Sequence, residues 1–125
     1  MPSLVGSEMC IRDRVGTHYE KVAEKCLESQ GYQILERNFS CRRGEIDLIA
    51  REGGYLVFVE VKYRRTADQG DPAEAVDQRK RRRIGQAAAY YLYLHGLPEN
   101  TPCRFDVVAL IPGRYRICKN AFELE

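Results

Sequence analysis

The chain contains no tryptophan, only two methionines and two histidines, and no long hydrophobic run. Its apolar stretches fall far below the roughly 20 residues of a membrane span, so we expect no transmembrane helix. The five cysteines are odd in number and widely spaced without a C-x-x-C pair, which argues against a disulfide framework and against a zinc site. A secretory pattern is also missing. These absences favour a reduced, cytoplasmic compartment.

The length of 125 residues fits a single domain with one hydrophobic core and no covalent staples. Residues 3–14, SLVGSEMCIRDR, resemble translated sequencing-adapter read-through. We therefore expect residues 1–15 to be a non-native or disordered segment and residues 16–125 to form the domain. The native N-terminus would then be missing or altered.

Apolar periodicity and turn residues predict the element order α-β-β-β-α-β-β. The first helix ends at Gly31, and two strands are joined by a Gly53-Gly54 turn of the kind that tight hairpins prefer. A capping box at residues 71–74 starts the second helix, which has a break near Asp77. The expected elements are a helix over 17–30, strands over 33–40, 45–50 and 55–63, a helix from 71 to about 94, and strands over 104–111 and 114–118.

Two carboxylates face each other in the predicted hairpin. Its two-residue turn places Asp47 opposite Glu60 and Glu45 opposite Lys62, with each pair on one side of the ladder. Two facing carboxylates repel each other and lose hydration, unless a divalent cation lies between them or one of them is protonated. A single Asp or Glu in a strand is usually a charge that reaches solvent, but that explanation does not cover two facing acids with Lys62 on the same face. The pattern indicates a metal site.

This set resembles the core motif of the PD-(D/E)xK nuclease superfamily, in which Asp and then Glu-x-Lys lie on adjacent strands. The surrounding sequence, GEIDLIA at 44–50 and FVEVK at 58–62, resembles that of the YraN family of small bacterial endonuclease-like proteins. Further matching blocks occur at residues 31–38, 77–84, 104–108 and 120–122. The resemblance implies an α/β fold with a restriction-endonuclease-like core, in which a mixed central β-sheet is flanked by helices.

The same resemblance implies a metal-dependent nuclease that hydrolyses phosphodiester bonds in DNA, either branched or single-stranded. Asp47, Glu60 and the Val61 carbonyl would hold Mg²⁺ or Mn²⁺, which prefer hard oxygen ligands. Lys62 would orient the attacking water or neutralise charge in the transition state. The alternative is a catalytically silent nucleic-acid-binding module of the same fold. A third hypothesis, a basic helix that contacts an acidic protein, leaves the facing carboxylates unexplained.

Glu20, on the first helix, is the fourth catalytic candidate that the resemblance implies. The family pattern is G-x-x-G-E, and here Tyr19 replaces the second glycine, so the start of the helix could be shifted. The partner implied is nucleic acid, DNA rather than RNA, and not a membrane. Many superfamily nucleases form homodimers to cut both strands, so a homodimer is compatible with the resemblance.

Basic residues surround the predicted site, although the net charge is only +2. Lys80 falls on the apolar stripe of the long helix, so it either extends to the helix edge or points into the cleft, and the family pattern favours the cleft. Gln86 and Tyr90 are one helical step apart and resemble a Gln-x-x-x-Tyr motif of some superfamily nucleases, but the three alanines between them also fit plain helix packing. Some arginines of the helix must be merely solvated. The predicted nucleic-acid contacts are Lys80, Arg64, Arg65, Arg79, Arg83, Gln86 and Tyr90.

Overall fold

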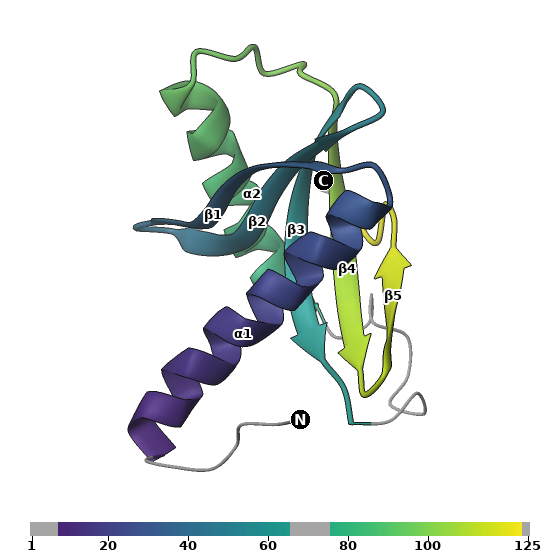
Figure 1. The fold of residues 1–125 in the computed structure, drawn as a ribbon. Coiled ribbons are helices and arrows are strands. Elements are labelled where there is room, and N and C mark those ends of the chain that lie inside the picture. Colours follow the sequence, from purple (N-terminus) through teal and green to yellow (C-terminus); the bar gives the residue numbers. More distant parts are fainter. Residues whose placement is uncertain (1–7, 66–75, 124–125) are drawn as a thin grey trace.

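Helices cover both faces of a five-stranded mixed sheet in the computed structural model, which describes residues 8–65 and 76–123, with side chains from residue 18 onward (Figure 1). Within these residues the element order is the predicted α-β-β-β-α-β-β. The elements are α1 (Glu8–Ser29), β1 (Gln33–Cys41), β2 (Gly44–Glu52), β3 (Tyr55–Tyr63), α2 (Gln78–Leu94), β4 (Cys103–Ile111) and β5 (Arg114–Cys118).

The strands lie in the order β1-β2-β3-β4-β5, and β3 and β4 are parallel while the other neighbours are antiparallel. The parallel pair arises because the chain passes from β3 through α2 before it returns as β4, and a parallel pair needs such a crossover. Between β2 and β3 the two-glycine turn is confirmed, since Glu52 pairs with Tyr55. Gly53 and Gly54 both have positive φ, at 57° and 87°, which suits glycine and fits a tight hairpin turn.

The core forms two layers because β3 is buried on both faces. Val57 and Val59 pack toward Leu27 of α1, whereas Phe58 packs toward α2 and contacts Tyr91 with its ring edge. A strand covered on both sides reads as a continuous apolar run, as residues 55–59 do. Figure 1 shows α1 crossing one face of the sheet and α2 lying behind the other.

Both helices start at other residues than the sequence predicts. α1 begins at Glu8, so it includes part of the segment expected to be disordered, and the non-native origin of residues 1–15 stays a prediction. α2 begins at Gln78, where Asp77 is the N-cap and its Oδ1 accepts from the Lys80 backbone N–H at 2.8 Å. The expected capping box at 71–74 lies outside the described residues, so the break near Asp77 stays a prediction. Among the described helices, none is long and apolar enough to cross a membrane.

Candidate functional site

The candidate site lies where β2 and β3 separate. Their antiparallel pairing runs as far as Leu48 with Val59, after which β2 continues beside β1 and β3 continues beside β4. The backbone N–H of Val61 donates instead to Oδ2 of Asp47, at 2.8 Å. A side-chain carboxylate thus takes the place of the strand backbone at the point of separation.

Asp47 and Glu60 come together on either side of this gap, as the hairpin register predicted. Their carboxyl groups are within hydrogen-bonding reach of each other, and Glu60 is 7% exposed. Burial, followed by the negative charge of Glu60, raises the pKa of Asp47 to about 7, although the Val61 N–H acts against this rise. Asp47 therefore holds its proton up to nearly neutral pH.

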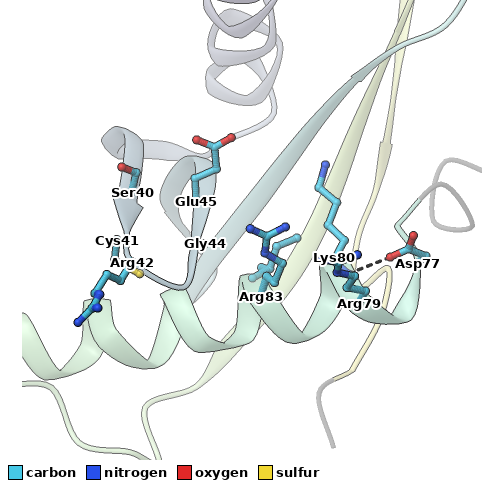
Figure 2. A pocket seen from close by; sticks show the side chains of 10 residues that line it. Ser40, Cys41, Arg42, Gly44, Glu45, Asp77, Arg79, Lys80 and Arg83 are labelled. Carbon is cyan, nitrogen blue, oxygen red and sulfur yellow. Dashed lines mark hydrogen bonds between the residues drawn. The ribbon is translucent and has the colours of Figure 1, made fainter.

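Two lysines neutralise Glu60. The Nζ atom of Lys80 contacts Oε2 of Glu60, and Nζ of Lys62 lies 3.4 Å from the same oxygen. Burial alone would lower the pKa of Lys80, but the hydrogen bond to Glu60 and its charge raise it above its usual value. Figure 2 shows the Lys80 side chain rising from α2, and its contact with Glu60 shows that it points toward the sheet rather than to the helix edge.

The predicted pairing of Glu45 with Lys62 is wrong. Glu45 pairs with Ser40 on β1, because the ladder between β2 and β3 ends before it reaches this position. The Glu45 carboxylate points away from α2 (Figure 2), and its charge acts on Glu20. Lys62 has its ion pair with Glu60 on its own strand instead.

Glu20 approaches the carboxyl pair from α1. Burial raises its pKa, a hydrogen bond with Asn38 lowers it, and the negative charges of Glu45, Glu24 and Glu60 raise it. In the described part of the chain no three His, Cys, Asp or Glu residues gather closely enough to hold a metal ion, so Glu20 does not complete a three-acid cluster. α1 starts at Glu8, ahead of the expected residue 17, and runs through Tyr19 and Glu20 without a break.

Tyr19 has a packing role where the family pattern has glycine. Its ring stacks on Tyr63 of β3, with centroids 4.6 Å apart and planes at 12°. The next residue, Glu20, is therefore anchored to the strand that carries Glu60 and Lys62.

A depression between α2 and the β1–β2 turn adjoins the site. It is lined by the predicted residues Arg79, Lys80 and Arg83, and on the turn by residues that include Arg42 (Figure 2). Gly44 allows this close approach, because a Cβ atom at that position would lie 2.6 Å from the carbonyl oxygen of Arg83.

Gln86 and Tyr90 are both exposed, although the Tyr90 ring also lies against Phe39 of the core. They line a second depression, with Arg42 and Arg43 of the turn, rather than the gap between the carboxylates. Gln86 and Tyr90 therefore lie beside the basic turn and apart from Asp47.

The remaining predicted arginines follow the end of β3. The backbone N–H of Arg64 donates to the Leu110 carbonyl at 2.8 Å, and its Nε is buried without a hydrogen-bond partner among the described residues. Arg65 is exposed at the end of the described range. Neither lines the two depressions beside α2.

A buried polar network that the sequence analysis missed lies on the other face of the sheet. Asp106 is 1% exposed and accepts hydrogen bonds from the Tyr32 hydroxyl at 2.7 Å, from Arg104 Nε at 3.0 Å and from the Asn120 backbone at 2.9 Å. Arg104 also donates to Glu52 at 2.7 Å. The spacing of Arg104 and Asp106, which puts both on one strand face, was the signal available. Because every charge in it is paired, the network is structural.

Comparison with known proteins gives one family. The model of the family described as "Uncharacterised protein family UPF0102" matches residues 19–110, which include all four candidate catalytic residues. A UPF0102 protein of Lachnoclostridium phytofermentans is 56% identical over 108 residues, covering 86% of this chain and 92% of that protein. A UPF0102 protein of Symbiobacterium thermophilum is 50% identical over 114 residues, covering 87% and 96%.

Proposed function

This chain belongs to the uncharacterised protein family UPF0102, and we propose that it is a metal-dependent nuclease that hydrolyses phosphodiester bonds in DNA. The observation that carries the proposal is the contact between the carboxyl groups of Asp47 and Glu60 at the separation of β2 and β3, with Lys62 and Lys80 beside them. Strongly shifted pKa values cluster at functional sites, so the raised pKa of Asp47 beside charged partners supports the proposal.

We also infer that the sheet is a restriction-endonuclease-like core of the PD-(D/E)xK superfamily. Three features support this inference. The element order matches, a helix covers each face, and Asp47 and Glu60-Val61-Lys62 lie on adjacent strands. The YraN family, which the sequence resembles, would then be the superfamily branch to which the UPF0102 proteins correspond.

The donor set fits Mg²⁺ or Mn²⁺. Asp47 and Glu60 offer hard carboxylate oxygens whose mutual repulsion a divalent cation relieves, and the Val61 carbonyl is the third candidate ligand. When bound, such an ion acts as a Lewis acid and lowers the pKa of a coordinated water. Among the residues that the structure describes no third carboxylate joins them closely, which suits ions that keep several waters.

Lys62 and Lys80 would stabilise the negative charge of a bound phosphate group. Lys62 and Lys80 converge on one oxygen of Glu60, so a phosphate group held at this point would meet two ammonium groups already in place. Positive charge that is fixed before the reaction stabilises the extra negative charge of a phosphoryl transition state without reorganisation. Arg79 and Arg83, on either side of Lys80 in α2, would hold flanking phosphates without reading sequence.

A catalytically silent nucleic-acid-binding module is the second candidate. Lys80 in contact with Glu60 favours it, because an ammonium group already balances part of the charge that a metal ion would balance. In that case the basic surface would bind nucleic acid although no bond is cleaved.

The test is cleavage of labelled duplex, single-stranded, flap and four-way DNA, each with and without Mn²⁺. We expect Mn²⁺-dependent cleavage, and we expect Asp47→Asn, Glu60→Gln and Lys62→Ala each to lower its rate by about a hundredfold or more with DNA affinity nearly unchanged. Glu99→Gln, an exposed carboxylate in the loop before β4, is the matched control. Salt-dependent binding without cleavage of any DNA form with Mg²⁺ or Mn²⁺ would establish the binding module instead.

A further inference from the structure

Five exposed residues form one straight stripe along α2. Arg79, Arg83, Gln86, Tyr90 and Tyr93 follow one another at alternating steps of four and three residues, which keeps them on a single helix face. The buried residues Ile84, Ala87, Ala88 and Tyr91 occupy the face toward the sheet. At 1.5 Å per residue the stripe is roughly 21 Å long, about six nucleotides at the spacing of a stacked strand.

The stripe changes from basic to aromatic along its length. Tyr93 is 78% exposed and Tyr90 is 44% exposed. Their rings stack on each other with centroids 6.3 Å apart and planes at 23°, and the ring of Tyr90 lies 6.3 Å from Phe39 of β1. Tyr90 is thus held against the sheet, whereas most of the Tyr93 ring meets solvent. The two stacked rings together form one exposed aromatic surface at the end of the stripe.

The β1–β2 turn adds two further positive charges beside the stripe. Arg42 lines both depressions along α2, and Arg43 lines the one that contains Gln86 and Tyr90. The turn is held there by the close approach of Gly44 to Arg83. The acidic groups that line the first depression are Glu45, which points away from α2, and the helix cap Asp77 (Figure 2).

We propose that this stripe, together with Arg42 and Arg43, binds a single nucleic-acid strand, with its phosphates on the arginines and an unpaired base stacked on Tyr93. The proposal rests on the proposed function, since it names the form of substrate that would lead to Asp47 and Glu60. Positive charge that follows the backbone, combined with an aromatic platform, is how proteins bind single strands without reading sequence. A base inside a duplex has both faces covered by its neighbours, so Tyr93 discriminates against paired DNA.

The experiment measures binding of the full chain by fluorescence anisotropy in EDTA, so that no turnover contributes. The probes are an oligothymidylate of about 12 nucleotides, an abasic strand of the same length and a blunt duplex. We expect the oligothymidylate to bind most tightly, and we expect Tyr90→Ala and Tyr93→Ala each to weaken its binding about fivefold or more. Tyr93→Phe retains the ring and should keep the affinity. Tyr55→Ala is the matched control, because Tyr55, at the start of β3, is 42% exposed, close to the 44% of Tyr90, and lies outside the stripe.

Three results would overturn the proposal. The first is equal affinity for the oligothymidylate and the abasic strand, which means that no base is stacked. The second is tighter binding of the duplex. The third is a wild-type dimer in sedimentation that Tyr93→Ala converts to a monomer, which assigns the aromatic surface to a second copy of the chain.

The failure of this proposal and the failure of the nuclease function are distinguishable. Cleavage with Mn²⁺ whose rate is unchanged by Tyr93→Ala on a single-stranded substrate would leave the nuclease and remove the strand site. Base-dependent binding in EDTA without cleavage under any metal condition would keep the strand site and remove the nuclease.

Discussion

Replacing Asp47 by Asn is expected to stabilise the protein at neutral pH, although it removes a predicted catalytic group. Asp47 is held against Glu60 in a partly buried gap, where burial and the Glu60 charge raise its pKa from 3.8 to about 7. An asparagine has nearly the same shape, and its side-chain oxygen can still accept the hydrogen bond that the Val61 N–H now donates to Asp47. The substitution therefore removes the unfavourable charge while it keeps the contact.

The sign and size of this change in stability follow from the pKa of Asp47 in the unfolded chain, 3.8, and in the folded protein, about 7. Between about pH 4 and pH 7 the folded protein holds a proton on Asp47 that the unfolded chain has lost, so the stability of the wild type falls as pH rises through this window. At about 1.4 kcal/mol per pH unit the full penalty above pH 7 is about 4 kcal/mol. Because Asp47 stays partly exposed, we expect a gain of about 1–3 kcal/mol for Asp47→Asn.

The assay is urea unfolding of both proteins in EDTA at several values between pH 4 and pH 8. The difference in free energy of unfolding should be close to zero at pH 4, where the wild-type carboxyl group is protonated, and should grow to its full value above pH 7. Asp77→Asn is the control, since asparagine caps a helix as well as aspartate and the difference should stay within about 0.5 kcal/mol at each pH. A variant that is less stable than the wild type at pH 8 would refute the reasoning.

Three further predictions concern the scaffold. Gly44→Ala should lower the free energy of unfolding by about 1–3 kcal/mol, because its Cβ would meet the Arg83 carbonyl oxygen; an unchanged urea midpoint would show that the turn can move away from α2. Asp106→Ala should cost about 3–5 kcal/mol in the same assay, because Arg104 loses a buried partner, whereas the half-exposed Lys119→Ala should cost little; equal losses would contradict this. Deletion of residues 1–14 should lower the melting temperature by less than about 5 °C, roughly 1 kcal/mol, because the described core contacts of α1 begin at Tyr19; a larger fall would show that the segment is structural.

The strands could be predicted from the sequence because two local signals agree there. Apolar runs give the buried lengths, and the Gly53-Gly54 turn fixes the register between β2 and β3, so the observed bounds differ from the predicted ones by two residues at most. The same register predicted the meeting of Asp47 with Glu60. A hairpin is a local structure, and its geometry depends on few residues outside it.

The separation of β2 and β3 could not be predicted from the hairpin alone. It depends on β3 pairing with β4, a strand some 40 residues away in sequence, while β2 follows β1 toward Gly44. This non-local competition is why the expected Glu45–Lys62 pair does not form. It also creates the gap in which the Asp47 carboxylate accepts the Val61 N–H.

Four residues of the stripe on α2, namely Arg79, Arg83, Gln86 and Tyr90, were predicted as nucleic-acid contacts from the sequence, but Tyr93 and their common helix face were not. The spacing of Arg83, Tyr90 and Tyr93 carries the information, but only the position of the β1–β2 turn shows that this face has positive neighbours, namely Arg42 and Arg43. Helical spacing gives the face of a residue, and tertiary contacts give what lies beside that face.

Two buried carboxylates on neighbouring strands, Glu60 on β3 and Asp106 on β4, have contrasting surroundings. Glu60 pairs with Val107 and Asp106 with Val59, so alternation along β3 and β4 puts Glu60 and Asp106 on opposite faces of the sheet. Asp106 has a guanidinium, a hydroxyl and a backbone N–H as donors, and its burial is balanced. Glu60 faces a second carboxyl group, which raises the pKa of Asp47 and leaves the fold less stable at neutral pH. At Asp106 the charges are balanced, whereas the pKa of Asp47 stays raised although Lys62 and Lys80 contact Glu60, so a divalent cation or a proton would still stabilise the pair of Asp47 and Glu60.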